Sequence, residues 1–278
     1  NMESAGNIIQ RNKFWTTLFS IFLGVSWAQA DLTKKTQLLF YFDKIEVNGA
    51  INVFVQPGDR NEEATIFADS SIMENISLTV RDRTLYLDAN NTYDLARRLP
   101  FIKLSAERIF PVEILVNTDK LSEIRLNERS NLTVSDIRSP RLSVFTTGTG
   151  RLHLDNSSID NLSVRQDGNG PIILKGKEVS SLELIVIGDG LIFAQDLPVD
   201  RARVLHRGNA NVEINPLSFL DSRIFGQGNI LLHSKPENIV VSQKGTGKVI
   251  DVIPDSPPLY DMNATRPVLF GKERPKRN

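Results

Sequence analysis

The chain has 278 residues, 40 % of them apolar, and it contains no cysteine. Basic and acidic residues number 33 each, so the net charge is zero, and this balance provides no broad electrostatic attraction for nucleic acid. Without cysteine the chain can form no disulfide, no thiolate zinc site and no thiol nucleophile. Exported eukaryotic domains usually carry disulfides, so the composition favours a bacterial envelope protein that is large enough to build its own core.

Residues 1–30 have the layout of a secretory signal. Arg11 and Lys13 form a basic region, an apolar run follows at residues 14–25, and Ala28-Gln-Ala30 matches an A-x-A cleavage site. The apolar run is shorter than the roughly 20 residues of a spanning helix. We therefore expect a signal peptide that is cleaved after Ala30, and no integral membrane segment in the mature chain. An uncleaved anchor or a buried helix is the alternative.

Residues 31–117 indicate a β region with irregular spacing. Two alternating apolar runs flank Asn48-Gly49-Ala50, and shorter runs follow at residues 65–68, 76–80, 84–87, 102–104 and 112–116. Turn residues separate these runs, as is typical of short strands. We interpret the region as wider, irregular coils continuous with the repeats that follow. A separate small β domain that ends near Asn117 is the alternative.

Residues 118–253 repeat with a period close to 20. Six turns of the form Gly-x-Gly, one of them Gly-x-Ala, begin at Gly148, Gly168, Gly188, Gly208, Gly226 and Gly245. Their first glycines are 20, 20, 20, 18 and 19 residues apart. One such turn is weak evidence, whereas six in nearly constant phase indicate a repeat architecture. We attribute the glycines to the backbone freedom that a tight bend requires.

Apolar residues keep the phase of these turns. In one coil, Leu162 and Val164 lie six and four positions before the first glycine. Ile172 and Leu174 lie two and four positions after the second. A third inward row lies nine positions before the first glycine and comprises Ile159, Val179, Val199 and Leu217.

This alternation with period two marks strands that bury one face, and such short strands are stable only when successive coils stack on one another. We therefore predict an all-β fold, a parallel β-helix with coils of about 20 residues. We expect it to be right-handed because parallel crossovers nearly always are. A leucine-rich repeat is the alternative, suggested by residues 121–127, but its asparagine does not recur and no helical half follows. Residues 254–278 are rich in proline and basic residues, and we expect a flexible tail.

Three features together resemble the head GIN domain family of auto-transporter adhesins. They are Phe42-Asp-Lys-Ile-Glu-Val-Asn-Gly, Pro111-Val-Glu-Ile-Leu-Val and the phased Gly-x-Gly turns. The resemblance covers about residues 40–252. It implies a secreted or envelope-exposed right-handed β-helix, and it brings no catalytic residues to carry over.

No set of side chains predicts a catalytic or metal site. His153, His206 and His233 fall at three different phases of the coil, so we interpret them as isolated surface histidines. Asp167 and Asp189 lie on adjacent turns but out of phase, whereas β-solenoid glycosidases hold paired carboxylates across a groove. We expect no enzymatic activity, no metal and no cofactor.

The middle residues of the six turns form one polar row. Its members are Thr149, Asn169, Asp189, Asn209, Gln227 and Thr246. Such a row could bind sugar or calcium. We favour a structural interpretation, in which turn-compatible side chains form local hydrogen bonds.

The sequence therefore predicts an exported bacterial protein of the periplasm, the outer-membrane surface or the extracellular space. We expect an adhesin-like β-solenoid whose rigid surface contacts an unidentified protein or glycan of the cell envelope, without a nucleic-acid partner. A carbohydrate-active β-helix enzyme, a polysaccharide hydrolase or lyase, is the alternative. A groove lined by several carboxylates and aromatics would distinguish it, and aromatics form only 7 % of the chain.

Overall fold

The computed structural model describes residues 32–99 and 102–252, with side chains described outside residues 93–108. The predicted signal peptide at residues 1–30 and the predicted tail at residues 254–278 lie outside the described residues. Almost all of the described chain belongs to one compact unit that begins at Thr33; of the preceding unit, Leu32 alone is described.

Within these ranges the chain is almost entirely β-structure, as predicted, with one 3-10 helix, η1 (Ser70–Asn75). The N-terminal strands are β1 (Leu32–Leu38), β2 (Lys44–Asn48), β3 (Asn52–Gln56), β4 (Glu63–Asp69), β5 (Ile76–Arg81), β6 (Thr84–Ala89), β7 (Thr92–Leu99), β8 (Ile102–Ile109) and β9 (Val112–Asn117). The following strands are β10 (Glu123–Leu126), β11 (Asn131–Ser135), β12 (Arg138–Thr146), β13 (Leu152–Gln166), β14 (Ile172–Gly176), β15 (Val179–Val186), β16 (Ile192–His206), β17 (Val212–Ile224), β18 (Ile230–Leu232), β19 (Asn238–Gln243) and β20 (Val249–Asp251). No helix in the described part is long and apolar enough to cross a membrane.

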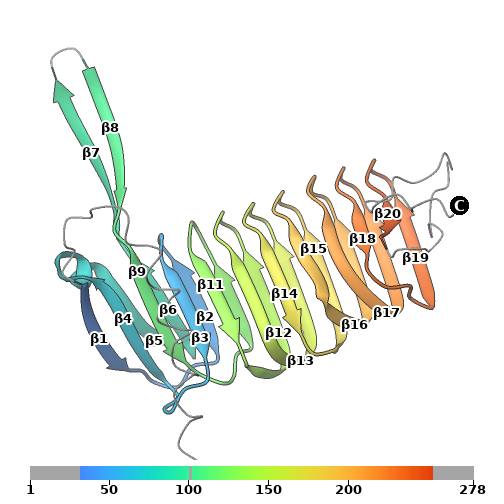
Figure 1. Ribbon diagram of the computed structural model, residues 1–278, viewed down its shortest axis with the longest axis horizontal. Helices are drawn as coiled ribbons and strands as arrows, with labels where there is room; N and C mark the ends of the chain where they lie inside the picture. The colour runs from blue at the N-terminus through green and yellow to red at the C-terminus, as the bar shows by residue number, and fades with distance from the viewer. Residues whose placement is uncertain (1–31, 100–101, 253–278) are drawn as a thin grey trace, which may run out of the picture. The chain divides into compact units, whose positions relative to one another are not determined.

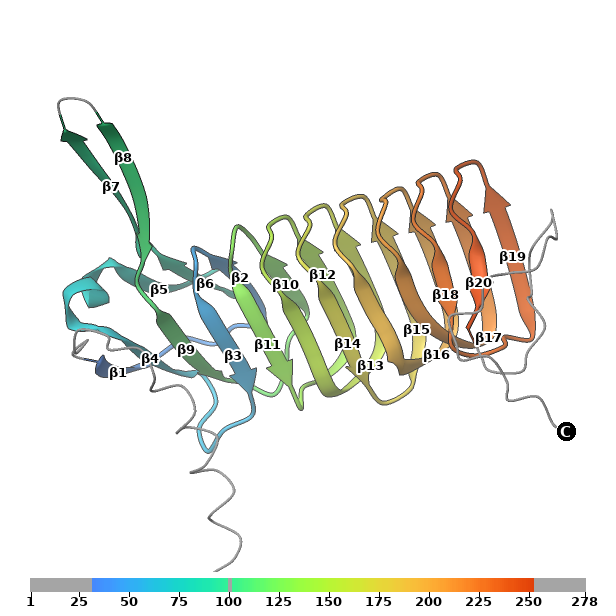
Figure 2. The same cartoon turned by 45° about the horizontal axis from the view of Figure 1, so that its top comes forward.

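From β10 onward the strands stack as parallel coils of a β-solenoid (Figures 1 and 2). Face 1 is formed by β10, β12, β15, β19 and the C-terminal parts of β13, β16 and β17. Face 2 is formed by β11, β14, β18, β20 and the N-terminal parts of β13, β16 and β17. Leu142 pairs with Leu162, and Leu162 pairs with Leu182, which is the predicted offset of one coil.

The N-terminal strands join this stack in an order different from their order in sequence. Strand β2 pairs in parallel with both β6 and β10, and β3 pairs in parallel with both β9 and β11. The coil β2–β3 therefore lies between two coils that follow it in the chain. Beyond the β6–β9 coil, β4 and β5 run antiparallel to β9 and β6. The hairpin β7–β8 forms a separate sheet that extends away from the coils (Figures 1 and 2).

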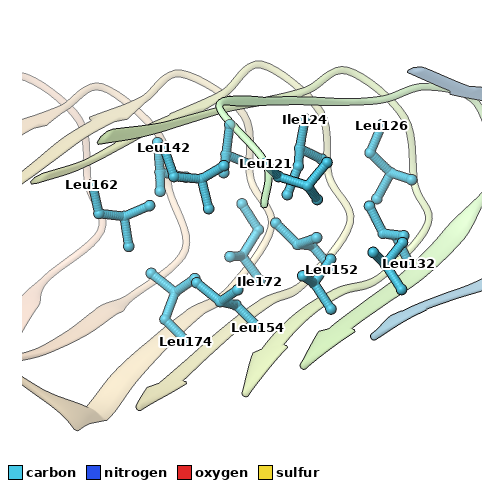
Figure 3. Close-up of a cluster of buried hydrophobic side chains, with 14 of the residues drawn as sticks. Leu121, Ile124, Leu126, Leu132, Leu142, Leu152, Leu154, Leu162, Ile172 and Leu174 are labelled. Carbon is cyan, nitrogen blue, oxygen red and sulfur yellow. The ribbon is translucent and has the colours of Figure 1, made fainter. Parts of the chain in front are cut away.

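The core consists of apolar side chains that point inward from both faces and stack in columns (Figure 3). Leu162, Ile172 and Leu182 each expose 2 % or less of their surface. Like residues contact one another from coil to coil at about 4.8 Å, the spacing of hydrogen-bonded strands. Each coil thus buries apolar surface on both of its neighbours, and no coil has a core of its own.

The predicted inward rows are largely confirmed, but the prediction that Leu217 points inward is wrong. Leu217 is 36 % exposed, and the neighbouring buried Pro216 pairs with Val199 in its place. The register shifts at this point because the coil is two residues shorter than those before it. Two polar residues occupy inward positions as well: Ser222 and Asp251 expose 1 % or less.

The turn glycines are required for a reason other than the one predicted. None of the six first-position glycines has a backbone φ in the left-handed region. A Cβ on Gly188 would lie 1.8 Å from the carbonyl oxygen of Gly168 in the preceding coil. The glycines therefore permit close approach between stacked backbones, and the attribution to bend flexibility is wrong.

Candidate binding surfaces

The predicted polar row lies along the edge where face 1 turns into face 2. Its members are exposed and adjacent, because successive turns stack on one another: Thr149, Asn169, Asp189, Asn209, Gln227 and Thr246. The Oδ1 of Asn169 accepts a hydrogen bond from the backbone N–H of Asp189 at 3.0 Å. The Oδ1 of Asp189 accepts from the backbone N–H of Asn209 at 2.8 Å and from its Nδ2 at 3.0 Å. The central side chains therefore connect neighbouring coils.

A second asparagine row, which the sequence analysis missed, lies directly after these turns. Asn131 accepts from the backbone N–H of Arg151 at 2.9 Å. Asn211 accepts from that of Asn229 at 3.0 Å, and Asn229 accepts from that of Lys248 at 2.9 Å. The three asparagines share one phase of the repeat, and that shared phase was the available signal.

Polar side chains also occupy an inward column two residues before the turns. Gln166 is fully buried, and its Nε2 donates to the backbone oxygen of Gly170 at 2.8 Å. His206, two coils later, is also fully buried, and its Nε2 lies 2.8 Å from the backbone oxygen of Ala210. Each side chain thus closes its own turn from inside, and His206 is a structural residue.

Burial lowers the pKa of His206 because the charged imidazolium loses hydration, while the hydrogen bond to the carbonyl of Ala210 opposes this shift. The neutral ring donates from Nε2 to Ala210, and its buried Nδ1 has no partner among the described residues. The interpretation of all three histidines as surface residues is therefore wrong for His206. His233 contacts Glu213 at 2.8 Å, whereas His153 is half-buried.

Several carboxylates at the coil surface are held by neighbouring cations. Asp167 pairs with Arg165 at 3.0 Å, and Asp196 pairs with Lys175 at 3.2 Å. Across residues 32–99 and 102–252, no group of three or more acidic or histidine side chains could hold a metal ion. Among the described residues these two carboxylates are thus engaged in ion pairs, and the acidic side chains form no cluster suited to a metal ion.

Face 2 carries an outward row of mainly apolar side chains. The pairing of its strands places one residue from each coil in this row: Phe54, Thr133, His153, Ile173, Phe193, Glu213, Leu231 and Ile250. Phe54 is 40 % exposed, and the others are half-buried against their neighbours. Leu191, two residues before Phe193 of the row, is 43 % exposed. Exposed apolar side chains gathered on one surface typically mark a contact surface.

Two hollows lie at the opposite corner of the coils. One, of about 570 Å³, is lined by residues from 41–43, 120–122 and 138–160, and the other, of about 550 Å³, extends to Lys177. Both include Arg138 and Ser158. This corner is not visible in the sequence, because its lining residues are far apart in the chain.

Residues 41–236, more than half of the chain, match the family model described as "Putative auto-transporter adhesin, head GIN domain". The chain belongs to this family. The resemblance inferred from the opening motif and the phased glycines is thereby confirmed. The surfaces described above lie within the head GIN domain match, except for the members of their rows that follow residue 236. Among the curated proteins, no match was found.

Solved structures share the fold of this head GIN domain at low sequence identity. A "putative adhesin" from Bacteroides fragilis is similar with a TM-score of 0.68 and 19 % identity, over 80 % of this chain and 97 % of its own. A "putative lipid binding protein" from Parabacteroides distasonis is similar with a TM-score of 0.58 and 18 % identity, over 81 % of this chain and 98 % of its own. At these identities the likeness establishes the solenoid alone.

Proposed function

We propose that the protein is an exported, adhesin-like envelope protein that binds a protein partner through face 2. The outward apolar row carries this proposal, because Ile173, Phe193 and Leu231 point away from the core and leave apolar surface in contact with water. Membership of an adhesin family supports it. A stack of coils without hinges presents these side chains at fixed spacing, so little conformational entropy is lost on binding.

Substitution on the two faces tests this function. Ile173→Ser combined with Phe193→Ser should reduce retention of the full chain by bacterial envelope fractions in a sedimentation assay, because apolar anchors dominate binding energy. Phe145→Ser on face 1 is the matched control, since Phe145 is also an outward, half-buried phenylalanine. Equal retention of both variants and the parent would contradict the proposal.

We further propose that export depends on the signal-like residues 1–30. Sequencing the N-terminus of the protein recovered from its native envelope should give Asp31 as the first residue. A recovered chain that still carries Phe14–Ala30 would contradict cleavage.

A further inference from the structure

The larger corner hollow combines cations, an aromatic ring and a buried carboxylate oxygen. Its lining includes Tyr41, Asp43, Lys120, Ser122, Arg138 and Arg141. Its volume of about 570 Å³ is within the range of small-molecule sites. The three cations are exposed, and in the described part of the chain none of them forms an ion pair.

This lack of ion pairs separates Arg138 and Arg141 from the other arginines of face 1. Arginines elsewhere on face 1 contact carboxylates: Arg125, Arg165, Arg203 and Arg223. Arginine presents a planar fork of donors that matches a carboxylate in two parallel hydrogen bonds. Arg138 and Arg141 therefore offer unused donors to an anionic group.

Asp43 lies in the wall of the same hollow. Its Oδ2 accepts from Ser122 Oγ at 3.1 Å and pairs with Arg83, whereas its Oδ1 is buried without a partner among the described residues. A buried carboxylate oxygen without a donor is unfavourable. Because this oxygen is buried, a ligand in the hollow does not reach it, and Asp43 instead holds Ser122 and Arg83 at the wall. Asp160, exposed at the rim, is the other carboxylate of the lining.

Tyr41 supplies a flat apolar surface beside these polar groups. It is 54 % exposed although the guanidinium of Arg83 lies 5.6 Å from its ring centre. Aromatic rings with a polar edge suit contacts that are apolar on one side and wet on the other. The C–H face of a sugar ring has this character.

The second hollow shows that the site continues along the corner. It shares Arg138 and Ser158 with the first and adds Lys177, Asn156 and two carboxylates, Asp119 and Asp136. A small anion would occupy only one of these hollows. A chain of several units would occupy both.

We propose that this corner binds an acidic saccharide segment of a polysaccharide. The cations receive its carboxylates, and Tyr41 lies against the C–H face of a sugar. This site goes beyond the proposed function, which depends on face 2, and either can fail without the other.

Calorimetric titration of the full chain with trigalacturonic acid tests the site, with neutral galactotriose as the comparison ligand. We expect binding of the acidic trisaccharide that weakens with added salt and at most weak binding of the neutral one. Arg138→Ala combined with Arg141→Ala should reduce affinity about tenfold or more, the loss expected for charge-assisted hydrogen bonds. Tyr41→Ala should also weaken binding, whereas Tyr41→Phe should bind more tightly than Tyr41→Ala.

Arg207→Ala, which removes an exposed arginine at the opposite edge, is the control and should bind as the parent does. Circular dichroism must show the parent fold; if the double variant fails that check, Arg141→Gln replaces it. The proposal is overturned by absent binding, by equal affinity for the neutral trisaccharide, or by affinity that Arg141→Gln and Tyr41→Ala leave unchanged. Tighter binding of inorganic phosphate or phosphatidylglycerol vesicles would also overturn it in favour of a phosphate ligand. Retention on envelopes, measured separately, reports on face 2.

Discussion

His206 is a titratable side chain held inside the solenoid, so it links folding to pH. Its pKa in the folded protein lies below the value of about 6.5 in an unfolded chain. Between these two values the unfolded chain binds more protons, so the free energy of unfolding should fall as the pH falls from 6.5 toward the folded pKa. Urea denaturation at neutral and mildly acidic pH measures this loss.

His206→Gln separates this effect from other titrations. The glutamine amide should donate to the carbonyl of Ala210, because Gln166 makes the same bond to Gly170 four residues ahead. We expect a variant that folds well at neutral pH and loses less stability on acidification than the parent. Identical pH dependence of the two proteins would show that His206 does not contribute.

A turn glycine tests the steric explanation of the repeat motif. Gly188→Ala places a Cβ against the carbonyl oxygen of Gly168, and the stacked backbones must separate. We expect a cost of about 3 kcal/mol or more, at the upper end of typical overpacking. Thermal denaturation measures it, with Ala210→Gly as the matched change at the second turn position. If Gly188→Ala costs no more than Ala210→Gly, close approach is not what selects glycine.

At the scale of one strand, β15 tests the register of the coils. Leu182 points into the core between Leu162 and Ala202, whereas its neighbour Glu183 is exposed. Leu182→Ala should cost about 2–5 kcal/mol, as buried leucine truncations do. Glu183→Ala should cost about 0.5 kcal/mol or less, as most surface changes do. Chemical denaturation compares the two, and equal losses would contradict the inward assignment.

Elements were predictable from sequence where the phase of the repeat is regular. The inward columns around Leu162 and Ile172 were found because every coil repeats them. The coil β10–β11 lies within the predicted repeat region, but its turn was not recognised because Glu128-Arg129-Ser130 replaces Gly-x-Gly there, with Glu128 in the left-handed region at a φ of 55°. The placement of β2 beside β6 and β10 was also missed, because periodicity says nothing about pairing between coils that are not consecutive.

The candidate sites were likewise predictable where they follow the regular phase of the repeat, and not where they depend on contacts between distant segments. The exposed row that contains Asn169 and Asp189 was visible because it has one phase and one kind of side chain. The inward column of Gln166 and His206 also has one phase, but apolar Val186 lies between these two polar residues. The column was not recognised because its side chains are not of one kind. The corner hollow required the segment at residues 41–43 to meet coils about 80 residues later, which local patterns cannot show.

At the scale of the whole molecule, the surface carboxylates bear on catalysis. Asp167 and Asp196 are paired with cations, and we expect neither to act as a general acid or base. Incubation of the full chain with pectin, alginate and peptidoglycan should release no new reducing or unsaturated ends. Reproducible release that disappears on substitution of one aspartate would show that the protein is an enzyme.

The position of the β2–β3 coil between later coils has a consequence for the order in which the chain folds. From β12 onward each coil docks on one that was synthesised about 20 residues earlier, so these coils can be added singly. Strand β2 can pair on both sides only after β6 and β10 have been synthesised. Its coil therefore closes long loops, and the contact of Ser122 with Asp43 spans 79 residues. Closing such a long loop is slower than local docking. We therefore expect the β2–β3 coil, although it precedes its neighbours β6 and β10 in the chain, to be enclosed only after both have formed.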